Sequence, residues 1–169
     1  RLVDHARFPS RVLFVCHGNI CRGPYAEGAL RRELSPRHRD RIEVSSAGFI
    51  KPGRQSPGVA VEVAGDRSVD LSGHRSRLVE ANSMEAADLV FVMERGQRSD
   101  LRRRFPAARI ILLGDLDPEA QARRRILDPV AQPAEVFRDV YERIDRCVGV
   151  LAARIESRMP ESRESRTAG

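Results

Sequence analysis

Tryptophan is absent from this chain of 169 residues, cysteine occurs only three times, and no apolar run approaches the length of a bilayer span. Two of the cysteines lie close together near the start, so the three do not form the disulfide framework of a small secreted protein. The stretch RLVDHARFPSRV at the N-terminus lacks the apolar core of a signal peptide. These absences predict a cytoplasmic protein with no membrane span.

Signatures of nucleic-acid binding are also missing. The net charge of +6 could attract an anionic partner, but the basic residues are nearly all arginine and are spread along the chain. The sequence contains no aromatic-basic RNA motif, no zinc finger and no long lysine run. We therefore interpret the charge as an arginine-rich solvated surface and expect no nucleic-acid partner.

What is present is an alternation of apolar β-type segments with helical patterns, over a length typical of one domain. Strands are expected at 11–15, 41–48, 87–93 and 108–114, and helices at 24–35, 56–68, 95–106 and 133–158. Strands separated by helices predict a single-domain α/β three-layer sandwich, with a parallel sheet covered by helices on both faces. We assign 1–10 to an N-terminal extension, 11–158 to the domain and 159–169 to a polar, disordered tail.

The segment FVCHGNICRGP (14–24) follows the first predicted strand, at the sheet edge where parallel α/β folds bind ligands. Gly18 permits unusual backbone angles, so successive N–H groups could curl around one anion. Pro24 suits the first turn of a following helix, and Arg22 can grip two phosphate oxygens in a planar, bidentate way. Besides Arg22, the residues of this anion cradle are His17, Gly18, Asn19, Ile20 and Cys21.

A thiol at the mouth of an anion cradle predicts nucleophilic catalysis by Cys16. The dipoles that bind phosphate also stabilise a thiolate, and such surroundings lower a thiol pKa from about 8.5 to roughly 3.5 to 7.5. Lowering the pKa by about 3 units requires on the order of 4 kcal/mol of preferential anion stabilisation. We therefore expect Cys16 to be the nucleophile and to be ionised.

Other uses of these cysteines remain open. Structural burial explains Cys21 as well as function does, and a reversible disulfide between Cys16 and Cys21 would shelter an oxidised nucleophile. Zinc would require further ligands at short spacing, and no Cys/His cluster exists elsewhere, so we expect no metal and no cofactor. Cys147 lies beside the apolar stripe of the last predicted helix, which indicates a core thiol.

The segment VLFVCHGNICRGP resembles the signature of the low-molecular-weight protein tyrosine phosphatases. The resemblance continues in order through VSSAG (44–48), DLSGHRSR (70–77), ADLVFVME (87–94), RRFP (103–106), LLGDLDP (112–118) and LDP (127–129). It implies a Rossmann-like fold with a four-stranded parallel sheet, a phosphocysteine intermediate, no metal, and phosphotyrosine as the typical substrate. It also implies that Asn19, Ser46 and His74 form a hydrogen-bond network that holds the loop in its shape.

Cleavage of a phosphate ester requires an acid that protonates the leaving oxygen. Two Asp-Pro pairs compete for this role, at Asp117 and Asp128, and both can reach the carboxyl edge of the sheet. From the residues alone the choice stays open, although Asp128 lies in a loop that could close over a substrate. The resemblance implies that Asp128 is the acid, and Phe49 is a candidate for apolar contact with the substrate from the other rim.

The sequence departs from the family pattern at Gly23, where Ser or Thr is usual, and at Val130 and Ala131, where aromatic residues often line the cleft. The missing hydroxyl normally donates to the sulfur, so its loss predicts a slow phosphatase. These departures keep open a phosphate-binding pseudophosphatase that recognises phosphorylated partners. A thioredoxin-coupled arsenate reductase is a further alternative, but residues 70–87 contain no cysteine for a disulfide relay.

The resemblance further implies that the partner is a phosphotyrosine-containing protein, for which a bacterial tyrosine kinase is a candidate. The sequence does not fix the pathway, the physiological substrate or the oligomeric state.

Overall fold

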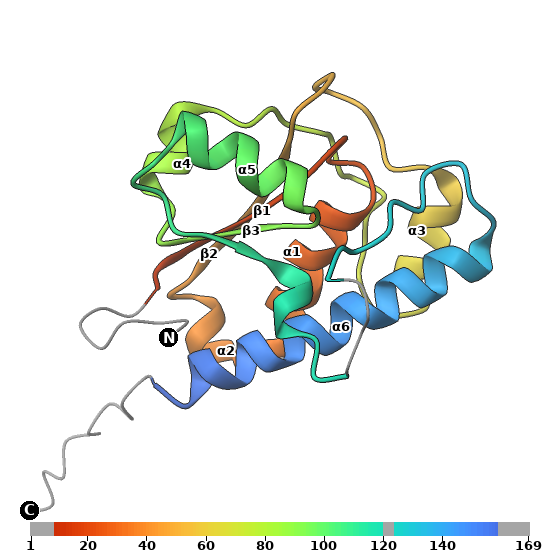
Figure 1. The fold of residues 1–169 in the computed structure, drawn as a ribbon. Coiled ribbons are helices and arrows are strands. Elements are labelled where there is room, and N and C mark those ends of the chain that lie inside the picture. The colour runs from red at the N-terminus through yellow and green to blue at the C-terminus, as the bar shows by residue number, and fades with distance from the viewer. Residues whose placement is uncertain (1–8, 120–123, 159–169) are drawn as a thin grey trace, which may run out of the picture.

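A four-stranded parallel sheet lies at the centre of the protein (Figure 1). The computed structural model describes residues 9–119 and 124–158, so the predicted disordered tail and most of the predicted extension lie outside the described residues. The strands are β1 (Arg11–Cys16), β2 (Glu43–Gly48), β3 (Leu89–Val92) and β4 (Ile110–Leu112), in the spatial order β2-β1-β3-β4. This arrangement confirms the predicted parallel α/β fold.

Helices cover both faces of the sheet and complete the three layers (Figure 1). One face carries α1 (Arg22–Glu33), α3 (Gly58–Gly65) and α6 (Ala134–Glu156), and the other carries α4 (Ala81–Ala86) and α5 (Arg95–Arg104). Three short helical segments were not predicted: α2 (Pro36–Arg39), α4 and the 3-10 helix η1 (Leu113–Leu116). The last strand is shorter than expected because η1 begins at Leu113.

Strand β1 is buried on both faces, as the central strands of parallel sheets are. Its side chains alternate, so Val12, Phe14 and Cys16 contribute to the core beneath α1 and α6, whereas Leu13 and Val15 contribute to the core beneath α4 and α5. This alternation places Cys16 at the carboxyl end of the strand, on the face that carries α1.

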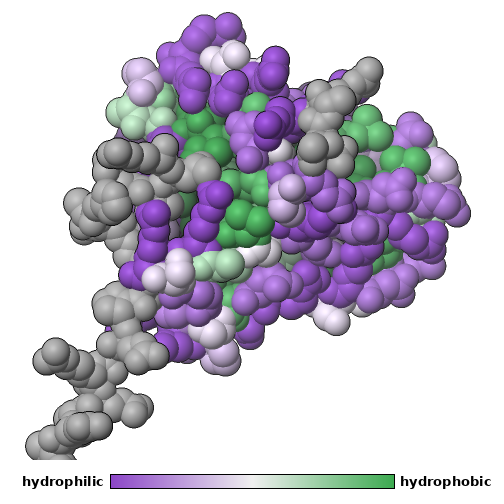
Figure 2. All heavy atoms as spheres, turned by 60° about the horizontal axis from the view of Figure 1, so that its bottom comes forward, coloured by the Kyte–Doolittle hydropathy of each residue, from purple (hydrophilic) through white to green (hydrophobic). Residues whose placement is uncertain are grey.

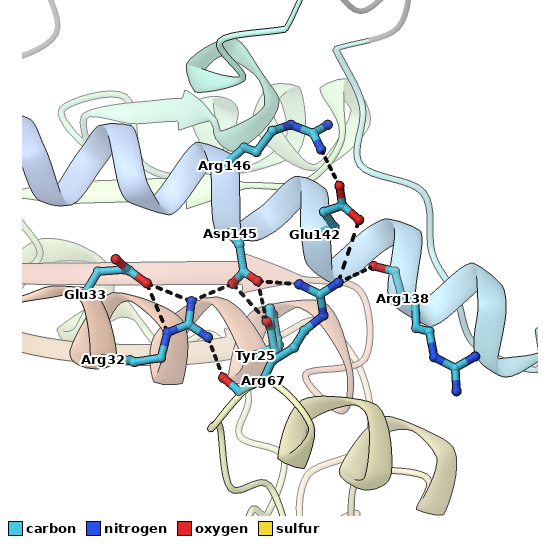
Figure 3. A network of polar contacts seen from close by, with 8 residues as sticks. All are labelled: Tyr25, Arg32, Glu33, Arg67, Arg138, Glu142, Asp145 and Arg146. Atoms are coloured by element: carbon cyan, nitrogen blue, oxygen red, sulfur yellow. Dashed lines mark hydrogen bonds and ion pairs between the residues drawn. The ribbon is translucent and has the colours of Figure 1, made fainter.

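A polar network fastens α1 to α6 (Figure 3). The Asp145 carboxylate accepts hydrogen bonds from the Tyr25 hydroxyl at 2.8 Å, from Arg32 at 2.9 Å and from Arg67 at 2.8 Å. The Tyr25 ring also stacks on Tyr141 of α6, with ring centroids 3.7 Å apart. Since Tyr25 lies in the first turn of α1, the network fixes the end of the helix that adjoins the predicted cradle.

The protein surface is largely hydrophilic on the face shown in Figure 2. Within the described residues, no helix is both long and apolar enough to span a membrane. Large exposed apolar side chains in this part of the chain are Leu78, Leu127 and Val130, which are 39%, 47% and 43% exposed. Two of the three, Leu127 and Val130, lie within two residues of the predicted acid Asp128 in the sequence.

Candidate active site

The loop between β1 and α1 forms a cradle of backbone amides. Among the residues that the structure describes, the N–H groups of Gly18, Ile20, Cys21 and Arg22 donate to no protein acceptor. The sulfur of Cys16 does have donors, since the Gly23 N–H lies 3.4 Å from Sγ and the Asn19 N–H also donates to it. Free amides beside a thiol and at a helix N-terminus favour the binding of an anion.

Asn19 holds the shape of this loop. Its backbone has a φ of 50°, in the left-handed region that Asn tolerates better than most residues. Its side-chain Nδ2 donates to Ser46 Oγ at 2.9 Å, and its carbonyl oxygen lies 2.7 Å from Nε2 of His74. The Arg77 N–H donates to Asn19 Oδ1 at 2.8 Å. The structure thus brings together Asn19, Ser46 and His74, as the resemblance implies.

Two further residues support the loop and were not identified from the sequence. Glu27 of α1 accepts the Ser46 hydroxyl at 2.7 Å, which orients the Ser46 oxygen as an acceptor for Asn19. Gly48 ends β2 against the cradle, where a Cβ would lie 2.8 Å from the Asn19 nitrogen and 2.9 Å from the His17 carbonyl oxygen. The motif VSSAG carries the signal for Gly48, because only glycine allows this close approach.

Arg22 is fully buried behind the cradle and is held by acidic and carbonyl groups. Nη1 donates to Glu94 at 2.8 Å and to the carbonyl of Ile126 at 3.0 Å, and Nη2 contacts the carboxylate of Asp128. The buried Nε has no acceptor among the described residues. An anion in the cradle would supply this acceptor, and it would compete with Asp128 for Nη2.

The Cys16 thiol does not meet the expectation of a lowered pKa in this conformation. Burial raises the pKa of Cys16, while Arg22 and the N–H groups of Gly23 and Asn19 lower it, and Asp128 raises it further. The result is a pKa above the ordinary value, because desolvation outweighs the donors and Asp128 offsets the charge of Arg22. With Asp128 on Arg22, the surroundings of Cys16 favour the thiol over the thiolate.

The structure places the two candidate acids in different environments. Asp117 has a side chain only 1% exposed, and it is held by Arg143 Nε at 2.8 Å and by Arg146 Nε at 3.2 Å. Burial opposes its ionisation, but the hydrogen bonds from Arg146, from the Glu119 N–H and from Arg143 leave the pKa of Asp117 below its ordinary value. Asp117 is therefore a structural anion, whereas Asp128 is 34% exposed and lines a cavity with Cys16.

That cavity has a volume of about 260 Å³ and an opening to solvent. The residues that line it are Cys16, His17, Gly18, Ile20, Cys21, Arg22, Ile50, Arg54, Asp128 and Val130. Phe49 is not among them, because its side chain packs against the core beneath α4 and α5. Ile50, the next residue, lines the cavity and supplies the apolar contact expected from Phe49.

All three cysteines are free and buried. Burial raises the pKa of Cys21 to about 12 and that of Cys147 to about 12, so neither thiol is reactive in this conformation. Cys147 belongs to the core, as predicted. Within residues 9–119 and 124–158, no group of three or more His, Cys, Asp or Glu side chains could hold a metal ion.

The sequence matches the family described as low molecular weight phosphotyrosine protein phosphatase over residues 11–161. The probable low molecular weight protein-tyrosine-phosphatase EpsP of Ralstonia nicotianae is 32% identical over 149 residues, which cover 86% of this chain and 96% of that protein. The structure of the tyrosine phosphatase Wzb from Escherichia coli K30 in complex with sulphate has a TM-score of 0.77 at 27% identity, over 88% of this chain and 99% of that chain. The YwlE arginine phosphatase from Geobacillus stearothermophilus has a TM-score of 0.77 at 29% identity, over 88% and 94%.

A parallel α/β fold with a thiol, an arginine and free amides around one cavity defines a class of enzyme suited to phosphate esters. Within that class, the chain belongs to the low molecular weight phosphotyrosine protein phosphatases and is a protein-tyrosine phosphatase. The match confirms the resemblance carried by residues 14–24. The relatives do not favour the arsenate reductase or the binding-only alternative.

Proposed function

We propose that this chain hydrolyses phosphotyrosine with Cys16 as nucleophile, Arg22 and the cradle amides as the phosphate site, and Asp128 as the acid. One observation carries the proposal: Cys16, Asp128 and Arg22, whose buried Nε has no acceptor among the described residues, line one cavity. The free amides of the cradle are positioned for the equatorial oxygens of a phosphoryl group.

Substrate binding would set up the proton transfer that ionises the nucleophile. The substrate phosphate displaces Asp128 from Arg22, which frees the carboxylate to accept a proton. The Cys16 thiol gives its proton to this carboxylate, directly or through water, and the thiolate attacks phosphorus. The P–S bond forms as the P–O bond to tyrosine breaks, and protonated Asp128 donates its proton to the departing phenolate oxygen.

The second half of the cycle reverses these roles. Asp128, now a carboxylate, takes a proton from a water molecule that attacks the phosphocysteine. The P–S bond breaks and the sulfur leaves as a thiolate stabilised by the Gly23 and Asn19 amides. No side-chain hydroxyl at position 23 assists this departure, so we expect hydrolysis of the phosphocysteine to be slow.

The lining of the cavity supports phosphotyrosine rather than phosphoarginine, on which an arginine phosphatase such as the structural neighbour YwlE acts. Ile20, Ile50 and Val130 offer apolar contact to a phenyl ring. A guanidinium would need acidic acceptors, but the one carboxylate among the lining residues is that of Asp128, which the proposed chemistry uses as the acid. The positive charge of Arg54 also disfavours a cationic substrate.

The natural substrate is then a phosphotyrosine-containing protein, and a bacterial tyrosine kinase is a candidate because the relatives EpsP and Wzb are bacterial tyrosine phosphatases. A reducing compartment such as the cytoplasm suits the enzyme, because its chemistry requires a free thiol at Cys16.

The test compares turnover of a phosphotyrosyl peptide, a phosphoarginyl peptide and p-nitrophenyl phosphate. We expect turnover of both aryl phosphates and little of the phosphoarginyl peptide. Cys16→Ser is expected to abolish turnover, and Asp128→Ala to lower kcat by about 10² to 10⁴ fold, with a smaller effect on p-nitrophenyl phosphate because its leaving group needs less protonation. Vanadate-sensitive peptide binding without turnover would instead indicate a pseudophosphatase. The presence of glycine at position 23, where Ser or Thr is usual in the family, would explain that result.

A further inference from the structure

Two arginines line the catalytic cavity, and only Arg22 has a role in the proposed chemistry. Arg54 is partly exposed and lies on the loop between β2 and α3. Its Nη2 donates to the Gly18 carbonyl at 2.8 Å, and a Cβ on Gly18 would lie 2.9 Å from the same nitrogen. The guanidinium therefore stands against the cradle backbone at the mouth of the cavity.

None of the described residues forms an ion pair that would neutralise the charge of Arg54. Its other hydrogen bonds go to the carbonyl oxygens of Lys51 at 3.1 Å and Ile50 at 3.4 Å, and it forms no ion pair with the described residues. Four half-buried arginines elsewhere differ, since Arg32 and Arg67 share Asp145, and Arg143 and Arg146 share Asp117. Arg54 thus presents an uncompensated cation to whatever occupies the cavity mouth.

The backbone of Arg54 is fixed in place. Its N–H donates to the Ser76 hydroxyl at 2.9 Å, and its carbonyl accepts the Ser76 N–H at 2.8 Å. Ser76 is buried, and its hydroxyl donates in turn to the Lys51 carbonyl at 2.8 Å. Lys51 and Gly53 have φ values of 42° and 79°, so the loop adopts a specific conformation around this serine. A cation held in this way is preorganised for recognition.

We propose that Arg54 is a specificity residue that binds the carboxylate of an Asp or Glu beside the phosphotyrosine of the protein substrate. The inference rests on the proposed function, because phosphate in the cradle places the flanking residues of the peptide at the mouth. The lining residues also include Asp128 and the apolar Val130, and Arg22 is occupied by the phosphate, so Arg54 is the lining arginine that remains for an acidic flank.

The test uses two non-hydrolysable phosphonate peptides that mimic phosphotyrosine and differ only at the flanking positions, which are Asp and Glu in one and Asn and Gln in the other. We expect the unmodified protein to bind the acidic peptide about threefold to tenfold more tightly. Arg54→Gln should reduce this ratio to about one, and Arg54→Lys should retain part of it. Arg75→Gln is the matched control, because Arg75 is exposed and does not line the cavity, and it should leave the ratio unchanged.

Three outcomes would overturn the inference: an unchanged ratio in Arg54→Gln, an equal loss of affinity for both peptides, or no binding of the acidic peptide by the unmodified protein. An equal loss would show that Arg54 serves only the cradle through its bond to Gly18. Turnover of p-nitrophenyl phosphate tests the proposed function separately. If turnover depends on Cys16 but the two peptides bind equally well, only the role of Arg54 is refuted. If the preference for the acidic peptide depends on Arg54 but there is no turnover, only the proposed catalysis is refuted.

Discussion

The carboxylate of Asp128 contacts Nη2 of Arg22, so the proposed acid and the proposed phosphate ligand are paired in the substrate-free enzyme. Glu94 holds the other terminal nitrogen of Arg22 at 2.8 Å. Phosphate can displace Asp128 without displacing Glu94, because the two carboxylates occupy different nitrogens. The pair therefore links binding of the substrate to release of the acid and to ionisation of Cys16.

Removing the charge of Asp128 should make Cys16 more acidic. Asp128 raises the pKa of the thiol, directly and by offsetting Arg22, so Asp128→Asn should lower this pKa and increase the thiolate fraction at neutral pH. The measurement is the ultraviolet absorbance of the thiolate as a function of pH, with Cys16→Ser as the blank. Asp115→Asn is the control, since Asp115 pairs with Arg98 outside the cavity. A titration midpoint that does not move, or moves upward, contradicts the proposed coupling.

Restoring a hydroxyl at position 23 should accelerate the second chemical step. A Cβ on Gly23 would lie 3.2 Å from the Cys16 sulfur and 3.2 Å from Asn19 Nδ2, which is tight but requires only small shifts. Gly23→Ser should speed breakdown of the phosphocysteine by roughly 10 to 150 fold, the effect of one charge-assisted hydrogen bond. Single-turnover kinetics measure this rate. Gly23→Ala carries the same crowding without the hydroxyl, so equal rates in the two variants would refute the explanation.

Gly48 should tolerate no side chain. The Cβ of Gly48→Ala would collide with the backbone of Asn19 and His17, so the substitution should lower the free energy of unfolding by about 1 to 3 kcal/mol and weaken vanadate binding. Gly149→Ala in α6 is the contrast, because its Cβ would meet no atom within 4 Å. That change should raise the free energy of unfolding by about 0.5 to 1 kcal/mol. Chemical denaturation measures both changes in the free energy of unfolding. Similar changes at the two sites would argue against a special role for Gly48.

The carboxylate of Asp145 should contribute to the attachment of α1 (Figure 3). Asp145→Asn removes the charge that Arg32 and Arg67 share and leaves one oxygen for three donors. We expect the free energy of unfolding to fall by about 1.5 to 3 kcal/mol, as measured by denaturant titration. Glu33→Gln, which removes a more exposed partner of Arg32, should cost less than about 1 kcal/mol. A cost for Asp145→Asn no larger than that of the control would show the network to be dispensable.

The sequence predicts the sheet well because its strands are short apolar runs between helical patterns. It also predicts the cradle, because Gly18, Arg22 and Pro24 each have a conformational or chemical property that suits an anion-binding loop before a helix. The short helix α4 was missed, since six residues are too few for a periodic pattern. Contacts between distant segments could not be foreseen, such as Glu27 on Ser46 and Arg54 on Gly18.

The prediction that Cys16 is ionised was wrong because it also depends on contacts between distant segments. A motif shows which donors surround a thiol, but it does not show how deeply the thiol is buried or that Asp128 occupies Arg22. Phe49 was misplaced because the local sequence does not show which side chain of the bend after β2 packs on the core and which lines the cavity.

The most direct test of the account is mass spectrometry of enzyme quenched in acid during turnover of a phosphotyrosyl peptide. The account predicts a phosphoryl group on the peptide that contains Cys16, accumulating because its hydrolysis is slow and diminishing in Gly23→Ser. Turnover with no phosphoryl group on Cys16 in either protein, or turnover that survives Cys16→Ser, would contradict it.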